Sequence, residues 1–121
     1  LEMEKEGESY AILSLSSAVS PYDIAIFPLF DKDGMDVMAR EIFSSIKSET
    51  GIIANLDTSG SIGRRYARAD EIGTPWAATI DHQSLKDKTV TIRRRDDQKQ
   101  IRVGVDSLIQ TLYSNSLGTL F

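Results

Sequence analysis

The chain has 121 residues, of which 40% are hydrophobic and 26% are charged, a size and composition that suit one globular domain with a single core. No apolar run approaches the roughly 20 residues that span a bilayer, so we expect neither a membrane span nor a signal peptide. Cysteine is absent and histidine occurs once, at His82, which excludes disulfides, cysteine-ligated metals and a histidine-rich metal site.

Charge is unevenly distributed along the chain. Residues 61–103 hold ten lysines or arginines against six acidic residues, a balance of +4, whereas the whole chain carries −4. A basic segment on an acidic chain is a common footprint of polyanion binding. Solvated charges on exposed strands give the same count, so both interpretations stay open.

The beginning of the chain is expected to precede the folded domain. Residues 1–9 are acidic and lack periodicity, which predicts a flexible lead-in or hinge and leaves residues 10–121 as the domain. Residues 11–16 alternate weakly between apolar and polar side chains and predict a short edge strand.

The next two elements carry clearer signals. The nearly continuous apolar run at residues 24–27, closed by Pro28, predicts a strand that is buried on both faces. Asp33 is a candidate N-cap for a helix that extends to about Glu49, and Gly51 supplies its stop. The apolar positions of this helix recur every three to four residues, at Met35, Met38, Ile42 and Ile46.

The second half of the chain contains most of the predicted strands. Because strands and helices alternate early and strands follow one another late, we expect parallel strands first and an antiparallel edge afterwards, in a mixed sheet covered by helices. The elements predicted there are a strand at residues 52–56, a helix at 61–72, strands at 75–80, 89–95 and 100–103, and a last helix over about 105–112.

The second predicted helix reverses the favourable arrangement of charges. Arg64, Arg65 and Arg68 crowd its N-terminal half, where the helix dipole disfavours cations, and Asp70 and Glu71 stand at the end where anions are disfavoured. Arg64 and Arg68 also repel each other at an i,i+4 spacing. Such violations tend to occur at functional sites.

Two interpretations of these arginines stay open. One is an anionic ligand beside the start of the helix. The other is pairing within the protein, for example of Arg68 with Glu71 or Asp57. The preceding DTSGSIG follows a strand and opens a helix, but it lacks the glycine spacing of dinucleotide-binding and P-loop sites.

A second basic cluster occupies residues 91–102. Strand alternation puts Thr91, Arg93 and Arg95 on one face, which we expect to be exposed. Guanidinium groups there can grip phosphates or hydrogen-bond to bases and stack on them. A solvated edge hairpin whose charges prevent aggregation is the equally open alternative.

Catalytic signals are weak. No serine or cysteine nucleophile has a histidine at a recognisable spacing, and no paired carboxylates stand in an apolar setting, so no catalytic or metal-binding residue is assigned. We expect His82 in a surface loop, and Trp76 and Tyr66 in the core rather than on a base-stacking surface.

Several segments together match one family. The stretch GSIGRRYARADEIG closely resembles the signature of the C-terminal anticodon-binding domain of archaeal and eukaryotic glycyl-tRNA synthetases, within the class IIa anticodon-binding fold. AVSPYDIAIFPL, GTPWAATID and TVTIRRRDDQKQIRV resemble other strands of that family. The resemblance spans about residues 15–112, and it implies a mixed five-stranded sheet flanked by three helices.

The resemblance also implies which residues contact an anticodon loop. Arg93 looks like the family's arginine on the exposed strand that reads an anticodon base. The other implied positions lie near the loop at a strand end and helix start, or beside Arg93 in the chain: Thr58, Ser59, Arg64, Arg65, Arg95 and Gln98.

The implied role is to dock the anticodon stem-loop of tRNA(Gly) so that the acceptor end reaches a separate catalytic domain. This chain has no class II adenylation motif, so we expect it to be inactive alone and to hold no cofactor, with ATP and Mg²⁺ bound by the parent's catalytic domain. A cytoplasmic, homodimeric parent without membrane association is also implied. The alternatives are an accessory or protein-interaction module that reuses the fold and, on weaker grounds, a nucleotide-binding fragment.

Overall fold

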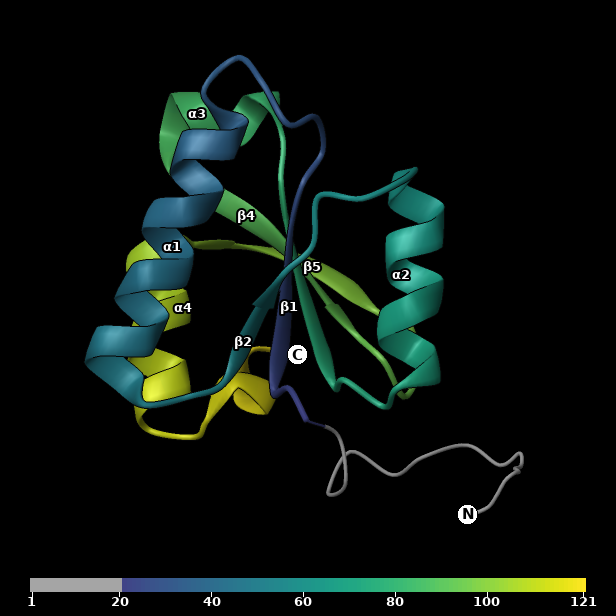
Figure 1. Ribbon diagram of the computed structural model, residues 1–121. Coiled ribbons are helices and arrows are strands. Elements are labelled where there is room, and N and C mark those ends of the chain that lie inside the picture. Colours follow the sequence, from purple (N-terminus) through teal and green to yellow (C-terminus); the bar gives the residue numbers. More distant parts are fainter. Residues whose placement is uncertain (1–20) are drawn as a thin grey trace.

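The computed structural model describes residues 21–121, which are drawn in colour in Figure 1. The predicted lead-in at residues 1–9 and the predicted edge strand at residues 11–16 lie outside this range. No helix within it is long and apolar enough to cross a bilayer. The elements in chain order are β1 (Ile24–Pro28), α1 (Met35–Thr50), β2 (Ala54–Leu56), α2 (Ile62–Glu71), β3 (Trp76–Ile80), α3 (His82–Asp87), β4 (Thr89–Arg94), β5 (Gln100–Gly104), α4 (Val105–Tyr113) and the 3-10 helix η2 (Leu117–Leu120).

The strands form one mixed sheet in the order β2-β1-β3-β4-β5. β1 is parallel to β2 and to β3, whereas β3, β4 and β5 are successively antiparallel, as the alternation of elements predicted. The chain crosses from β1 to β2 in one direction and from β2 to β3 in the other. Because both crossovers are expected to be right-handed, α1 and α2 lie on opposite faces of the sheet (Figure 1).

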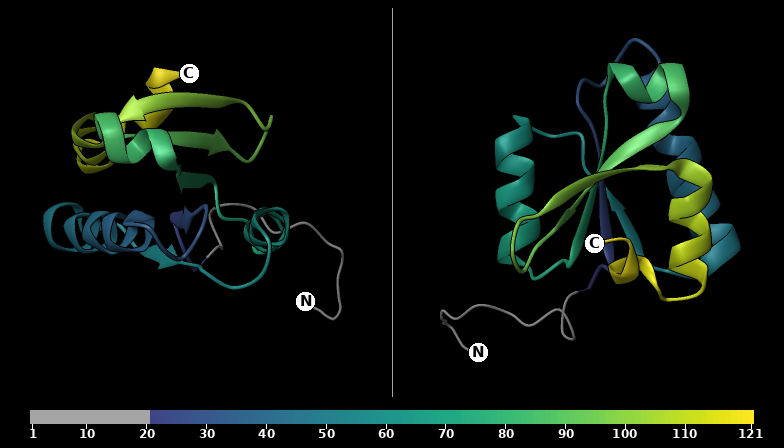
Figure 2. Two further views of the ribbon diagram at one scale, coloured as in Figure 1. Left: turned by 90° about the horizontal axis from the view of Figure 1, so that it is seen from above. Right: turned by 180° about the vertical axis from the view of Figure 1, so that it is seen from behind.

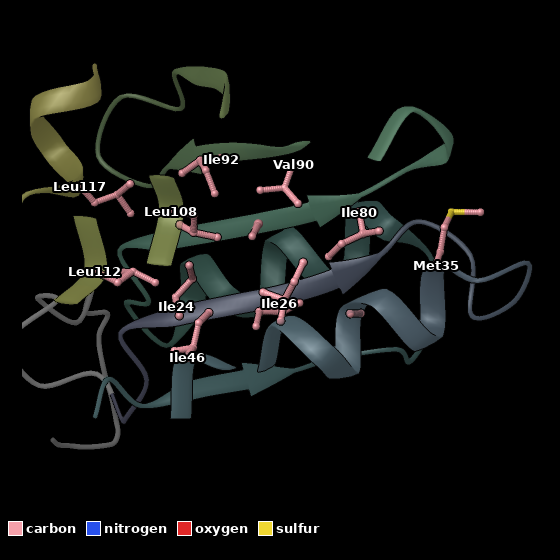
Figure 3. Close-up of a cluster of buried hydrophobic side chains, with 13 residues drawn as sticks. Ile24, Ile26, Met35, Ile46, Ile80, Val90, Ile92, Leu108, Leu112 and Leu117 are labelled. Carbon is pink, nitrogen blue, oxygen red and sulfur yellow. The ribbon is translucent and has the colours of Figure 1, made fainter. Parts of the chain in front are cut away.

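The main core lies between the sheet and helices α1 and α4 (Figure 3). Ile24 and Ile26 of β1 and Val90 and Ile92 of β4 are completely buried on this face, and Leu108 meets them from α4. Burying one such aliphatic side chain contributes about 1.5–3 kcal/mol. Most of the hydrophobic stabilisation is therefore concentrated on one side of the sheet.

Helix α2 covers only part of the opposite face. Ala25, Phe27 and Ala77 form a smaller core there with Ala69 of α2. The Tyr66 ring packs edge-on against Phe27, with centroids 5.1 Å apart. In the view from above in Figure 2, α2 lies beside β1, and the described helices leave the same face of β4 and β5 uncovered. This uncovered half of the sheet is available for a ligand.

The start of α1 differs from the prediction. The N-cap is Gly34, not Asp33, and no side chain caps this helix. Asp33 and Gly34 have φ angles of 62° and 93°, so both adopt the left-handed conformation. The N-cap prediction was wrong because an N-cap aspartate needs extended backbone to reach the first turn.

The short helix α3 was not predicted. It is held by a capping box, in which the Ser84 backbone N–H donates to Asp81 Oδ1 and the Asp81 backbone N–H donates to Ser84 Oγ, each at 3.0 Å. Six residues are too few for a helical repeat to be visible in the sequence. His82 is exposed as predicted, but it is the first residue of this helix rather than part of a loop.

Truncating Ile26 tests the main core. Ile26→Ala is expected to lower the free energy of unfolding by about 2–5 kcal/mol, because it opens a cavity in the central strand. Urea denaturation followed by circular dichroism measures the change. Val37→Ala, on the exposed side of α1, is the control and should change stability by about 0.5 kcal/mol or less. Equal effects of the two substitutions would contradict this placement of the core.

Candidate nucleic-acid interface

The loop that precedes α2 is exposed. Thr58, Ser59 and Gly60 are all solvent-accessible, and Gly60 has a φ of 79°. Ser61 caps the helix, because its Oγ accepts a hydrogen bond from the Arg64 backbone N–H at 3.3 Å. The structure thus places Thr58 and Ser59 where an external ligand can reach them.

Arg65 lies inside the protein, which corrects the expectation that it faces a ligand. Its side chain is buried and donates only to backbone carbonyls. Nη1 donates to the Pro28 oxygen at 2.5 Å and to the Asp57 oxygen at 3.4 Å, and Nε and Nη2 donate to the Gly60 oxygen at 3.2 and 3.1 Å. Arg65 therefore ties the ends of β1 and β2 to the loop before α2.

Arg68 is paired within the protein. Its Nε and Nη2 contact both carboxylate oxygens of Asp57 at 2.9–3.0 Å, and Nη2 also donates to the Ser59 carbonyl. The pairing of Arg68 with Asp57 was one of the two open interpretations, and it is confirmed. Arg64 is different, because it is exposed and its guanidinium has no hydrogen-bond or ion-pair partner within residues 21–121.

Arg93 is not exposed, contrary to the prediction. It does lie on the predicted face of β4, but only 10% of its side chain is accessible because α2 reaches it from the side. Nη1 and Nη2 donate to the two carboxylate oxygens of Asp70 at 2.9 and 3.0 Å, and the guanidinium carbon lies 5.0 Å from the centre of the Tyr66 ring. Asp70 thus draws Arg93 toward α2.

Arg95 and Gln98 lie in the segment that joins β4 to β5. Arg95 Nε donates to the Asp70 carbonyl at 3.0 Å, so it also helps to hold the end of α2. Gln98 is exposed in the turn between β4 and β5, with a φ of 60°. The structure brings Arg93 and Arg95 together around Asp70, apart from the cluster formed by Thr58, Ser59 and Arg64 at the other end of α2.

Arg102 of β5 is a surface residue that the sequence reasoning did not single out. Its Nη1 donates to Thr89 Oγ1 at 2.8 Å, and Nη2 donates to Thr91 Oγ1 at 3.2 Å and to Asp81 Oδ2 at 2.5 Å. The guanidinium therefore extends from β5 across β4 toward the end of β3. The sequence does indicate this position, because alternation along β5 puts Gln100 and Arg102 on one face of the strand and the apolar Ile101 and Val103 on the other.

A groove on the helical side of the sheet has the wrong charge for nucleic acid. It lies between α1, α3 and α4, has a volume of about 1690 Å³ and includes Val37, Leu85 and Tyr113 among its lining residues. More carboxylates than lysines line it: Glu41, Glu49, Asp87 and Asp106 against Lys86 and Lys88. Within the described residues no cluster of histidine and acidic side chains is arranged to hold a metal ion.

The sequence also matches known proteins. A family model described as an anticodon binding domain matches residues 23–115. The chain belongs to this family. It is 45% identical over 105 residues to the glycine–tRNA ligase of Methanococcus maripaludis, and 46% identical over 115 residues to that of Methanothrix thermoacetophila. These alignments cover 87% and 95% of this chain but only 18% and 20% of the relatives, so the chain spans about a fifth of their length.

Solved structures share the fold of this anticodon-binding domain. The RNA binding domain of threonyl-tRNA synthetase from Cryptosporidium parvum Iowa II superposes with a TM-score of 0.71 at 21% identity, over 84% of this chain and 25% of that one. Prolyl-tRNA synthetase from Cryptosporidium parvum superposes with a TM-score of 0.70 at 15% identity, over 88% and 24% of the two chains. The mixed five-stranded sheet with flanking helices, expected from the family resemblance, is confirmed.

The structural role of Arg65 in this anticodon-binding domain can be separated from the role of its neighbour. Arg65→Gln is expected to lower the free energy of unfolding by about 2–4 kcal/mol, because it leaves buried carbonyls without their donors. Arg64→Gln, one residue earlier on the exposed side of α2, should change it by about 0.5 kcal/mol or less. Denaturant titration of both variants gives the comparison, and an unchanged stability of Arg65→Gln would refute the internal role.

The turn between β4 and β5 yields a pH prediction. Hydrogen bonds from Arg94 and from the Lys99 backbone lower the pKa of Asp97 from 3.8 to about 2. A lowered pKa in the folded state means that the pair stabilises the domain above about pH 4, and that this contribution is lost as the pH falls toward 2. Arg94→Gln should return the Asp97 pKa toward 3.8, as measured by carboxyl NMR titration; an unchanged value would contradict the pairing.

Proposed function

We propose that this chain is the anticodon-binding domain of a glycine–tRNA ligase and that it docks the anticodon stem-loop of tRNA(Gly). One observation carries the proposal: an exposed loop and a polar sheet surface meet at the same edge of the molecule. β2 and β3 both run parallel to β1, so their carboxyl ends lie together. Residues 57–60 follow β2 and Asp81 follows β3, so the loop and the Asp81 end of the polar surface lie toward the same edge, on either side of β1.

The two parts of this surface suit different parts of a nucleic acid. Thr58, Ser59 and Arg64 offer two hydroxyl groups and a free guanidinium at the start of a helix, which are typical phosphate contacts. The uncovered strands offer a floor of polar side chains on which unstacked bases can lie. Docking at this edge would combine backbone contacts with contacts to bases.

The chemistry of aminoacylation is assigned to the rest of the parent protein. We propose that a separate catalytic domain binds ATP and Mg²⁺, that this domain alone does not charge tRNA, and that the parent is a cytoplasmic homodimer. The relatives named above are glycine–tRNA ligases, which disfavours the alternative of an accessory module.

Titration of the chain with a tRNA(Gly) anticodon stem-loop tests the proposal. We expect specific binding that weakens with salt: for two phosphate contacts, a fourfold rise in salt lowers the affinity about sevenfold. Arg64→Gln should weaken binding to all loops alike and reduce the salt slope by about 0.7 of a unit. A loop with its central anticodon bases replaced serves as the comparison, and equal binding of both loops would overturn anticodon recognition.

A further inference from the structure

Strands β4 and β5 have one apolar face and one polar face. Toward α4, strand β5 contributes Ile101 and Val103, which pack against the main core. On the other face its residues are Gln100 and Arg102, which lie opposite Arg93 and Thr91 of β4. A sheet face that packs against its own protein is apolar. This polar face is open to solvent in the described part of the chain and can meet a ligand.

Arg102 is held in one orientation on this face. The hydroxyls of Thr89 and Thr91 accept from its two terminal nitrogens, and Asp81 accepts from Nη2. Two of these partners come from β4 and the third is the N-cap of α3, so the guanidinium is fixed before any ligand arrives. Such preorganisation lowers the entropic cost of forming a specific contact.

Arg102 and Asp81 can each form a further hydrogen bond. Asp81 Oδ1 accepts from the Ser84 backbone and hydroxyl, whereas Oδ2 accepts only from Arg102 among the described residues. The Nε–H of Arg102 has no acceptor within residues 21–121. A guanidinium donor and a carboxylate acceptor are thus available side by side.

The ionisation of Asp81 is secure at neutral pH. Partial burial raises the pKa of Asp81, but hydrogen bonds from Arg102 and Ser84 outweigh it and bring the pKa below its ordinary value. The carboxylate can therefore accept hydrogen bonds but cannot donate them.

Arg93 on the neighbouring strand has less to offer a ligand. Its two terminal nitrogens are engaged by Asp70, its ring-facing side lies against Tyr66, and it is nearly inaccessible. The side chain of Arg102 is 28% accessible, almost three times as much. Arg93 lies at the border of the uncovered strands, where α2 packs against it, whereas Arg102 lies on their exposed surface.

We infer that Arg102 and Asp81 together read the Watson–Crick edge of an unstacked cytosine, an inference that rests on the proposed anticodon-binding function. Cytosine presents one donor, its N4 amino group, beside the acceptors N3 and O2. A carboxylate accepts from N4, and a guanidinium donates to the neighbouring acceptors. Glycine codons begin with two guanines, so glycine anticodons contain two adjacent cytosines.

The same pair discriminates against uracil. Uracil carries the acceptor O4 where cytosine carries its amino group, so its oxygen would face the Asp81 carboxylate. Two acceptors left facing each other cost both the lost hydrogen bond and electrostatic repulsion. The acid accepts from the cytosine amino group and so orients the base, and the arginine donates to the base only in that orientation; both residues therefore contribute to the preference for cytosine.

The test measures binding of stem-loops that carry cytosine or uracil at each of the two positions. Wild type should prefer cytosine by about tenfold or more at one position. Asp81→Asn keeps a residue that caps helices well, but its amide can either accept or donate, so the preference should fall to about twofold or less. Arg102→Gln should weaken binding of the cytosine loop about tenfold and leave the uracil loop nearly unchanged.

Arg94→Gln is the matched control. Arg94 also pairs with an aspartate, and its side chain is also 28% accessible, but it projects from the opposite face of β4 over the Phe121 ring. Its substitution should leave the ratio of the two affinities unchanged. Arg102→Lys separates charge from geometry: it keeps the positive charge but loses the planar fork, and it should lose the cytosine preference.

Each outcome decides a different question. If wild type fails to bind the stem-loop at all, the proposed function fails and this inference fails with it. If wild type binds and prefers cytosine, but Asp81→Asn and Arg102→Gln keep the preference as Arg94→Gln does, the anticodon-binding function stands and the reading pair is wrong. A loss of preference confined to the Asp81 and Arg102 variants supports the pair, since an unfolding effect would weaken both loops equally.

Discussion

The buried guanidinium of Arg65 is the contact on which the binding edge depends. It donates to carbonyls at the end of β1, just after β2 and in the loop before α2, and so adds to the backbone hydrogen bond from the Asp57 N–H to the Ile26 carbonyl. Asp57 adds a second connection from β2 through Arg68. Because these bonds satisfy the backbone internally, the exposed loop has a defined shape without using its own outward-facing groups.

The unequal coverage of the sheet explains where binding can occur. α1 and α4 bury the central strands on one face, and this face supplies most of the hydrophobic stabilisation. α2 covers the other face only over β1 and β3, so β4 and β5 can carry polar side chains there without loss of core packing. The main core and the proposed binding surface thus lie on opposite sides of the same strands, and a side chain can change on one side with little effect on the other.

Much of the fold was predictable because it depends on local patterns. Apolar runs and helical spacing predicted the sheet, its mixed character and the three longer helices. The site was less predictable because it depends on partners distant in the chain: Arg93 turns inward toward Asp70, which is 23 residues away. Arg64 and Arg65 are adjacent arginines, and only the direction in which each side chain projects from the α2 axis makes one exposed and the other buried. The Arg68 pairing with Asp57 stayed one of two alternatives until the loop was placed.

The turn between β4 and β5 fixes which side chains of β5 lie on the proposed binding surface. Arg94 N–H donates to the Lys99 carbonyl at 2.9 Å, and Gln98 closes the turn in a left-handed conformation. Residues on β5 alternate between faces, so a slip of β5 by one residue against β4 would exchange Arg102 and Gln100 with Ile101 and Val103. The turn therefore has to close the hairpin in this register: a slip of one residue would bury the polar side chains and expose the apolar ones, whereas a slip of two residues would preserve the character of both faces.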